Sequence, residues 1–486
     1  MIHRTLRVPA ALAAALALST QAAAQQPAPA RGDTLTVTLQ DALARALANG
    51  DEVRLAESRR SAASAQIGQA RATGLPQLRM TTAFTHVYEN ARAQAVGQIF
   101  NQPNTYNVNF NLSVPLFQGG RVGAGLRAAA RTRSAATADV EQARADVTLN
   151  LLRAYLDALF AQRQVEIQRE QVRLADERVR QMEQMERAGR ASRYDVLRAR
   201  VERSNLEPAA IQAAGNVELA VLEVKRLANI PIEQPLKLVS GVSADEVAAL
   251  ARGTGSAASD SAAIASLPAV RAAELRAQAS RAGVSVARAD YLPTVSVFLA
   301  SGWQAYPTGW SIPTSRGGLD TVTCPAGSAA DRVCTQQNGG WFSDRSAGLQ
   351  LSFPVFDGLR ARSNVALARA QADVAAAQAA QAREAAAVGL AQARADLARA
   401  QAQFAATRQN AAEAAEAFRL AQLRFSRGLS TQLDVSDAQL ALATAQTNEA
   451  RATYDLYLAT ADLARAQGRP VPLPGGPAPT TTTTSR

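Results

Sequence analysis

The sequence has little of the material from which most catalytic sites are built. It contains two histidines and two cysteines in 486 residues, and one histidine falls in the N-terminal segment. The other, His86, lies in a predicted strand, where a structural role is the expected one. No phosphate-binding loop, nucleophile elbow or dinucleotide-binding turn occurs. We therefore predict that the protein is not an enzyme and holds no cofactor or metal ion.

Aromatic residues and long apolar runs are also scarce. Aromatic side chains make up 5% of the chain, and no stretch after the N-terminus approaches the roughly 18 consecutive apolar residues of a transmembrane helix. The formal net charge is +11, but the arginines that supply it alternate with aspartate and glutamate. Such mixing is typical of solvated helix faces, so we expect no nucleic-acid partner.

The N-terminus has the three parts of a secretory signal. Arg4 and Arg7 precede an apolar stretch at residues 10–18, and the small residues 22–24 form a cleavage site. The apolar stretch is too short to span a bilayer. We therefore expect residues 1–24 to be a signal peptide that is removed on export.

The chain repeats itself once over a long distance. The segment Leu112–Gly119 (LSVPLFQG) matches Leu351–Gly358 (LSFPVFDG) at an offset of 239 residues (358 − 119). Gly189 and Gly428, each followed by an Asp-Val pair, share that offset. Two long halves, rather than many short units, indicate an internal duplication. We predict a first repeat over residues 25–229, a linker over 230–267, a second repeat over 268–468 and a tail over 469–486.

Each half is predicted to contain a very long helix. No proline occurs between residues 119 and 208 or between residues 358 and 470, and the composition of both stretches favours helix. Gly119–Gly189 and Gly358–Gly428 each span 70 residues (189 − 119 and 428 − 358), or about 105 Å as helix. Rods of this length have to pack side by side, in a coiled coil or a helical barrel.

The end of each rod carries the residues of a tight helical turn. A glycine can take the left-handed conformation that ends a helix, and a Ser/Thr-x-x-Asp pattern caps the helix that returns. The residues concerned are Gly189, Ser192 and Asp195 in the first half, and Gly428, Thr431 and Asp434 in the second.

A period-two alternation marks the strands. Tyr106–Val114 alternates apolar and polar residues without a break, and Leu349–Phe353 repeats the pattern in the second half. Leu78–Tyr88 and Thr294–Trp303 are weaker candidates for their hairpin partners. The alternation fits a strand between lipid and lumen, although a soluble sheet with one wet face would show it too. The signal peptide and the rods favour strands of a membrane barrel over a soluble sheet.

Four strands are too few to close a barrel, which takes about eight. Closure therefore requires several chains, and three chains would supply twelve strands. We expect a mainly helical chain whose strands join those of other copies in a β-barrel.

The half-repeats, the Pro-x-Phe-x-Gly segments that end the strands and the Gly-then-Asp-Val turns resemble the TolC-type outer-membrane efflux channels. The resemblance covers residues from about Thr38 to Gly468. It implies a homotrimer with a twelve-stranded barrel in outer-membrane lipid, a helical barrel through the periplasm, and an equatorial band built from residues 230–267 and both termini. It also implies passive export of small molecules or proteins, as the exit duct of a tripartite efflux pump or a type I secretion system.

Such channels work with a periplasmic adaptor (membrane fusion) protein and with an inner-membrane pump or ABC exporter. The resemblance assigns the contact with the adaptor to the helical turns, here Gly189, Ser192, Gly428 and Thr431.

The resemblance also indicates a periplasmic aperture. In the family the second-half turn carries two carboxylates that line the closed opening, and Asp434 and Asp437 stand at the matching positions. Their spacing puts them on one face of the returning helix, and Asp195 is the corresponding residue of the first half. A capping role is the plainer one for Asp195 and Asp434, but Asp437 has no such role.

Two positions near this turn depart from the family pattern. Phe425 stands where the family has a tyrosine that holds the mouth shut, and Ser430 stands where it has an arginine. We therefore expect a mouth that is cation-selective but less tightly latched than the family pattern implies.

Two other protein classes stay open on the sequence. A periplasmic adaptor also combines long helical hairpins with β domains, but normally has a single hairpin. A trimeric autotransporter-type adhesin also closes twelve strands from three chains, but its strands lie together at the C-terminus. A requirement for detergent separates the channel from the adaptor, and surface proteolysis separates it from the adhesin.

Two further features of the sequence are local. Cys324 and Cys334 lie in a polar loop of the second strand hairpin, and in an oxidising compartment we predict a disulfide between them. Residues 469–486 are rich in proline and threonine and lack apolar periodicity, so we predict disorder there. On that expectation, deletion of Pro470–Arg486 leaves both trimer assembly and export intact.

Overall fold

The structure of the chain, a computed structural model, describes residues 34–89, 91, 95, 103–239, 243–253, 260–307, 309–322 and 334–473. The predicted signal peptide, Cys324 and residues 474–486 of the tail lie outside the described residues.

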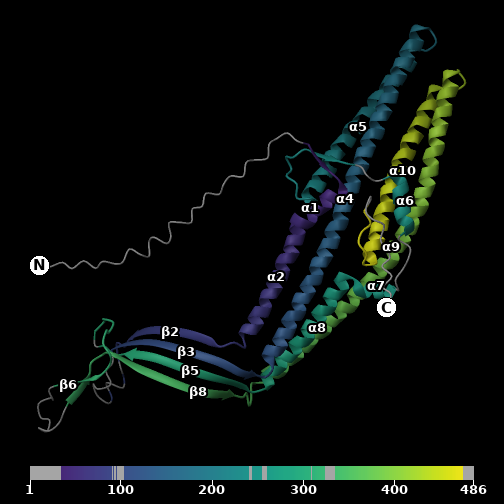
Figure 1. Cartoon of the computed structure of the whole chain (residues 1–486). Helices are drawn as coiled ribbons and strands as arrows, with labels where there is room; N and C mark the ends of the chain where they lie inside the picture. Colours follow the sequence, from purple (N-terminus) through teal and green to yellow (C-terminus); the bar gives the residue numbers. More distant parts are fainter. Residues whose placement is uncertain are drawn as a thin grey trace, which may run out of the picture.

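Two long helical hairpins form most of the molecule (Figure 1). The first consists of α4 (Arg121–Arg187) and α5 (Arg193–Leu227), and the second of α9 (Arg360–Ser426) and α10 (Gln432–Ala466). Helices α4 and α9 both have 67 residues, and α5 and α10 both have 35. The two predicted rods and their returning helices are confirmed, and each rod is about 100 Å long.

Shorter helices complete the layer at the end away from the hairpin turns. Helix α2 (Asp51–Ala72) packs against the lower part of α4, and α8 (Pro268–Arg288) lies between α4 and α9. An ion pair of 2.6 Å between Arg383 and Glu274 joins α9 to α8. The order across the layer is α5, α4, α10, α9 near the hairpin turns and α2, α4, α8, α9 farther down. One edge of the layer is therefore formed by α2 and α5, and the other by α9.

A four-stranded sheet lies at the end of the helical layer away from the hairpin turns (Figure 1). Strands β2 (Gln77–His86), β3 (Asn104–Gln118), β5 (Thr294–Ala305) and β8 (Trp341–Ser352) are antiparallel and adjacent in that order. The four predicted strands are confirmed, although β8 begins earlier than the alternation indicated. All four connections between a strand and a helix lie at the same end of the sheet. The connection from α8 to β5 contains the short η2 turn (Ala289–Tyr291).

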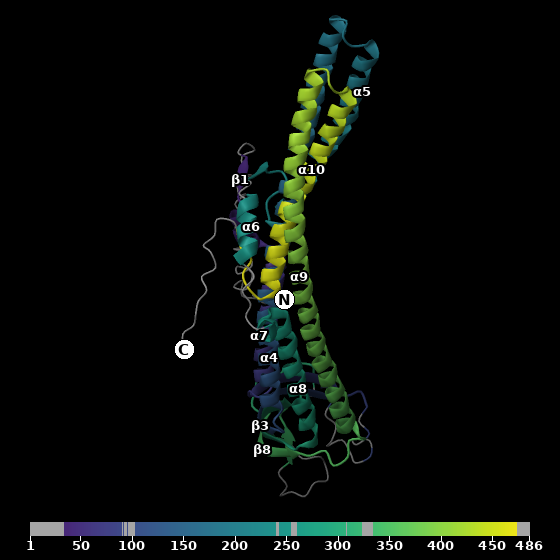
Figure 2. The same ribbon diagram turned by 90° about the vertical axis from the view of Figure 1, so that its right-hand side faces the viewer.

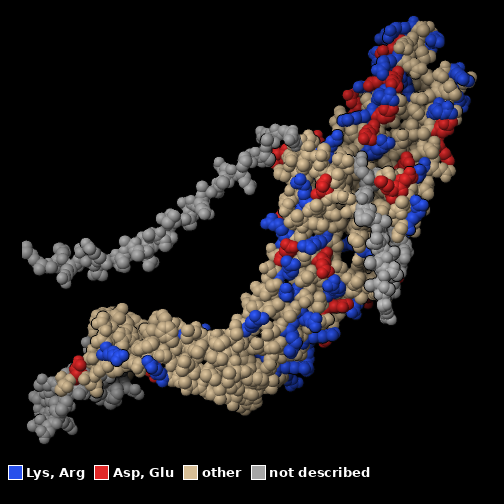
Figure 3. Space-filling view, viewed as in Figure 1, with Lys and Arg blue, Asp and Glu red and all other residues tan. Residues whose placement is uncertain are grey.

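The register gives the sheet an apolar face and a polar face. Residues that pair across antiparallel strands point to the same side, so Leu78, Leu112 and Leu299 form a row on one face. The pair Thr81 and Asn109 belongs to the opposite face. Among the described residues, no helix covers either face, and Leu78 is 69% exposed. Figure 3 shows charged side chains spread over the helices, while most of the visible sheet surface carries none.

Segments from distant parts of the chain pack around the middle of the helical layer (Figure 2). Strand β1 (Leu35–Val37) pairs in parallel with β4 (Leu236–Leu238). Helices α1 (Leu39–Asn49), α6 (Ala244–Gly253) and α7 (Asp260–Ser266) accompany this pair. We call this group of segments, together with residues 469–473, the belt.

One tyrosine ties the belt to the rod. The hydroxyl of Tyr155 on α4 donates to the carbonyl oxygens of Val37 and Val239, at 3.1 and 2.8 Å. Burial raises the pKa of Tyr155 to about 12, so the hydroxyl keeps the proton that it donates. Because Tyr155 contacts the last carbonyl of β1 and the carbonyl that follows β4, it fixes the two strands at one height along α4.

The first residues of the predicted tail are ordered, unlike the expectation. Val471 and Leu473 pack against the core of the belt, and the hydroxyl of Tyr457 donates to the carbonyl oxygen of Pro472 at 2.8 Å. Disorder was expected from residue 469 onward, but residues 469–473 pack against the core of the belt. Two apolar side chains and the hydrogen bond from Tyr457 hold these residues in place there.

A further pair of strands lies in the longer loop of the second half. Strand β6 (Leu319–Val322) pairs with β7 (Cys334–Gln337) in antiparallel orientation. Because Cys324 lies outside the described residues, its disulfide with Cys334 stays a prediction.

Candidate functional site

The turns at the tips of the two hairpins repeat the same backbone. Gly189 (φ 65°) and Gly428 (φ 73°) both take the left-handed conformation that was predicted to end the rods. The next residues, Arg190 and Leu429, each donate their N–H to a carbonyl five residues earlier, at 2.8 Å in both turns. The tips are therefore two copies of one rigid turn.

The predicted helix caps follow these turns. The hydroxyls of Ser192 and Thr431 accept the backbone N–H of Asp195 and Asp434, at 3.2 and 3.3 Å. Each aspartate in turn accepts the N–H of its cap residue, at 3.0 and 2.8 Å. The hydrogen bonds from the side chain and, less strongly, from the backbone of Ser192 lower the pKa of Asp195. The hydrogen bonds from the backbone and, less strongly, from the side chain of Thr431 lower the pKa of Asp434. Both carboxylates therefore stay ionised in mildly acidic solution.

Asp437 lies one turn beyond Asp434 on α10. Both are exposed, and their i, i+3 spacing puts them on one face of the helix. Within the described part of the chain, the carboxylate of Asp437 has no hydrogen bond or ion pair. The structure thus brings Asp434 and Asp437 together, while Asp195 lies on the tip of the other hairpin.

A polar network joins the two hairpins behind their tips. Arg178 of α4 donates to Ser436 Oγ and to Gln439 Oε1 of α10, both at 2.6 Å. Glu202 of α5 accepts from Ser436 Oγ at 3.2 Å and lies 3.7 Å from the Arg178 guanidinium. Gln439 Nε2 donates to Gln171 Oε1 of α4 at 2.7 Å. Three helices therefore meet in one set of side-chain hydrogen bonds, which we call the Arg178 network.

The Arg178 network is largely withdrawn from water. The side chain of Arg178 is 12% exposed, and Gln171 and Gln439 are 4% and 5% exposed. Burial lowers the pKa of Arg178, and the Glu202 carboxylate opposes that shift. Buried polar groups are costly without their partners, so the network favours one position of α10 against α4 and α5.

Apolar contacts lie nearer the turns. Met182, Val196 and Ala199 are buried together, and Phe425 of α9 packs against them. The expectation of a loosely latched mouth rested on Phe425 and Ser430. In the structure Phe425 packs between the two hairpins. The Arg178 network also joins the hairpins, and it includes neither Phe425 nor Ser430.

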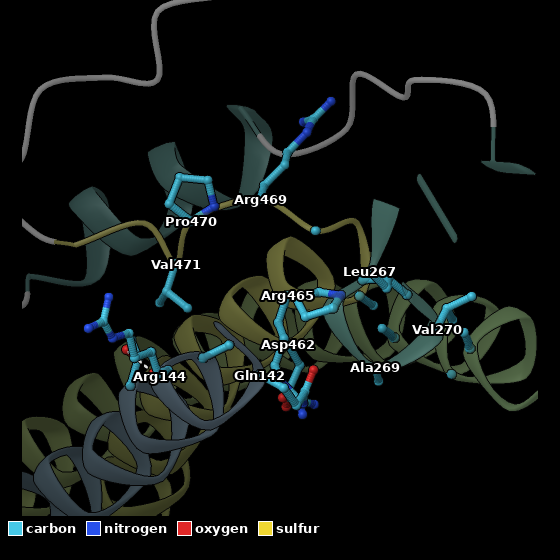
Figure 4. A pocket seen from close by; sticks show the side chains of 18 of the residues that line it. Gln142, Arg144, Leu267, Ala269, Val270, Asp462, Arg465, Arg469, Pro470 and Val471 are labelled. Carbon is cyan, nitrogen blue, oxygen red and sulfur yellow. Dashed lines mark hydrogen bonds between the residues drawn. The ribbon is translucent and has the colours of Figure 1, made fainter. Parts of the chain in front are cut away.

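A hollow of about 800 Å³ opens beside the belt, where α10 ends and α8 begins (Figure 4). Residues 469–471 lie above it, and Arg144 and Arg465 belong to its lining. Glu57 neutralises Arg144 at 2.9 Å, and Asp146 pairs with Arg465. Because these arginines already have counter-charges, we assign no ligand to the hollow.

The described residues hold no group of three or more His, Cys, Asp or Glu side chains that could bind a metal ion. Among the same residues, none of the helices is both apolar enough and long enough to span a membrane.

Comparison with known proteins places both halves of the chain in one family. Residues 42–229 and 261–469 match the family described as outer membrane efflux protein. Among curated proteins, the chain is 27% identical to Protein CyaE of Bordetella pertussis over 374 residues, which cover 76% of this chain and 71% of that protein.

Solved structures share the fold. The CmeC outer membrane channel of Campylobacter jejuni has a TM-score of 0.71 at 18% identity, covering 88% of this chain and 85% of that one. The outer membrane protein VceC of Vibrio cholerae has a TM-score of 0.69 at 19% identity, covering 89% and 97%. Since the family match covers both hairpins, the sheet strands and the turns between them, this chain belongs to the outer membrane efflux protein family.

Proposed function

We propose that three copies of this outer-membrane efflux channel form one continuous duct, with a twelve-stranded barrel in the outer membrane and a helical barrel in the periplasm. The proposal is carried by the free edges of the sheet and of the helical layer, which lie on the same two sides. Edge strand β2 is preceded by edge helix α2, and edge strand β8 is followed by edge helix α9. Joining β8 and α9 of one copy to β2, α2 and α5 of the next extends both layers at once. A closed ring leaves no edge unpaired.

Apolar side chains on the edge helices support this joining. On α2 and α5, Leu55, Ile211 and Leu219 are 53%, 68% and 67% exposed. On α9, Leu367 and Val374 are 60% and 57% exposed. Apolar residues left in water along both edges are typical of a surface that another chain covers.

The two-faced sheet supports the barrel. Its apolar face suits lipid, and its polar face suits a water-filled lumen. All three tryptophans of the chain, Trp303, Trp310 and Trp341, lie at or beyond the end of the sheet away from the helices. Tyr291 and Phe353 are exposed near the opposite end. Aromatic residues at both ends are typical of strands that cross a bilayer between two interfaces.

The composition argued against catalysis, and the family is one of channels. Energy for export then comes from an inner-membrane pump or an ABC exporter, linked to the duct by a periplasmic adaptor. We assign the adaptor contact to the hairpin turns, with Gly189, Ser192, Gly428 and Thr431, because these turns form the end of the duct away from the membrane. Small molecules or proteins are the cargo.

The number of chains tests the assembly. Light scattering of the detergent-purified protein should give a protein mass of three chains. The double variant Ile211→Arg/Leu219→Arg, which places charge on the free edge of α5, should lower that mass while helix content by circular dichroism is unchanged. A wild-type protein that stays a single chain in detergent would contradict the proposed ring.

The aperture has its own prediction. Three copies bring Asp434 and Asp437 to six carboxylates around one opening, which favours cations and binds multivalent ones. In planar bilayers, Asp434→Ala/Asp437→Ala should lose most of the cation selectivity and weaken block by trivalent cations about tenfold or more. Because the pKa of Asp434 is lowered, wild-type selectivity should hold from pH 7 to pH 5.

The capping role of Asp434 calls for a matched control. Thr38 and Asp41 form the same capping box at the start of α1, far from the tips. Asp41→Ala removes a cap of the same chemistry and should leave selectivity unchanged. Equal selectivity in the wild type and the double variant would remove both aspartates from the pore.

A further inference from the structure

A polar patch interrupts the apolar face of the sheet. Arg345 of β8 pairs directly with Ser301 of β5, and Ser301 pairs with Phe110 of β3. Phe110 pairs in turn with Met80. Ser343 precedes Arg345 by two residues and so points to the same side. Two hydroxyls and one guanidinium are therefore neighbours on a surface that is otherwise mainly apolar.

The guanidinium of Arg345 has no counter-charge in the sheet. The four strands contain three residues with permanent charge, Arg79, Asp344 and Arg345. Asp344 is adjacent to Arg345 in the strand and so faces the polar side, as does Arg79. Arg345 is exposed and has no hydrogen bond or ion pair within the part of the chain that the structure describes. Strand β2, which closes the ring beside β8 in the proposed trimer, has no carboxylate either.

The patch lies toward the end of the sheet away from the helices. Ser343 pairs with Trp303, and Trp341 lies four residues from Arg345 along β8. Because the helices occupy the periplasm, this end of the sheet faces the outer leaflet. An arginine side chain is long enough to bring its head to the level of neighbouring interfacial tryptophans.

We propose that Arg345, Ser301 and Ser343 bind the phosphate of a phosphorylated glycolipid in the outer leaflet of the membrane. This inference rests on the proposed barrel. The guanidinium and the two hydroxyls supply several hydrogen-bond donors and a positive charge, which is the chemistry that a phosphate requires. Trp303 and Trp341 offer flat apolar surfaces on which the C–H faces of a sugar can pack. A three-chain ring carries three such sites.

The test measures lipid bound to the intact channel. Protein washed free of lipid in detergent is incubated with lipopolysaccharide, and native mass spectrometry counts the glycolipid bound to each assembly. Arg345→Gln should weaken binding about tenfold, which corresponds to about 1.4 kcal/mol. Arg345→Lys, which keeps the charge, should recover part of it. Arg79→Gln, which removes an arginine from the polar face of the same sheet, should bind like the wild type.

Each outcome separates this site from the barrel itself. Equal binding by the wild type and Arg345→Gln on an intact ring overturns the site and leaves the proposed function standing. Equal binding of phosphatidylglycerol, tested in parallel, overturns the choice of a glycolipid. An assembly mass of a single chain in the same spectra contradicts the ring before any lipid is counted.

Discussion

Replacing Arg178 with methionine should free the α9–α10 hairpin from the α4–α5 hairpin and destabilise their contact by about 3 kcal/mol. Methionine keeps the apolar stem of the side chain but removes every hydrogen bond of the guanidinium. Ser436 and Gln439 then lose the donor that they share at 2.6 Å, and Glu202 loses its positive neighbour. Since buried polar groups without partners are unfavourable, the tips should move apart until water reaches these groups.

Distances between spin labels at Arg190 and Leu429, on the two tips, measure this effect directly. The wild type should give a narrow distribution within each chain, and Arg178→Met a broad one. Channel recordings should show the same change as a mouth with unsteady conductance. Arg178→Lys, which retains one charged donor group, should give an intermediate result.

Arg173→Met is the matched control. Arg173 lies on the same helix, but its ion pairs with Glu170 and Glu177 stay within one or two turns of α4. Exposed ion pairs of this kind contribute little to stability, and neither of these two pairs joins the hairpins. Identical tip distances in the Arg178→Met and wild-type proteins would show that the Arg178 network does not hold the hairpins together.

Truncating the chain after Gly468 should lower stability by about 3 kcal/mol, whereas truncation after Leu473 should leave it unchanged. The first deletion removes Val471 and Leu473 from the core of the belt and leaves the buried hydroxyl of Tyr457 without Pro472. Two half-buried apolar side chains and one hydrogen bond together account for an effect of that size.

Comparing the two truncations separates the effect of residues 469–473, which pack against the core of the belt, from the effect of shortening the tail. Thermal unfolding followed by circular dichroism should show a lower midpoint for the shorter protein only. The single variant Tyr457→Phe should cost about 1 kcal/mol, because it removes the hydroxyl but keeps the ring. Equal midpoints for both truncations would show that residues 469–473 contribute nothing to the belt.

The long helices and the strands could be predicted because their signals are local and periodic. The glycines at the two ends of a helix-favouring, proline-free stretch predicted the extent of each rod, and the alternation in Tyr106–Val114 predicted the core of β3. The caps at Ser192 and Thr431 were equally readable, since a capping box lies within four residues. The duplication added strength, because each weak pattern occurred twice at the same spacing.

The Arg178 network could not be predicted in the same way, and the belt was expected only from the family resemblance, as an equatorial band built from residues 230–267 and both termini. Arg178 and Ser436 are 258 residues apart, and Arg178 does not differ in type from the many solvated arginines on the helices. Within the belt, β1, β4 and residues 469–473 are three short segments without periodicity. Which polar residue of an arginine-rich helix becomes buried depends on the crossing of helices, and a single sequence does not report that crossing.

The uncovered apolar face and the two unpaired strand edges constrain the biogenesis of the channel. A lone subunit cannot enter the bilayer in its final fold, because β2 and β8 would carry unpaired N–H and C=O groups into hydrocarbon. Before the proposed ring closes, the same edges can pair with the strands of other proteins. For the proposed ring, insertion into the bilayer therefore has to be concerted with oligomerisation, because only the closed ring pairs both strand edges.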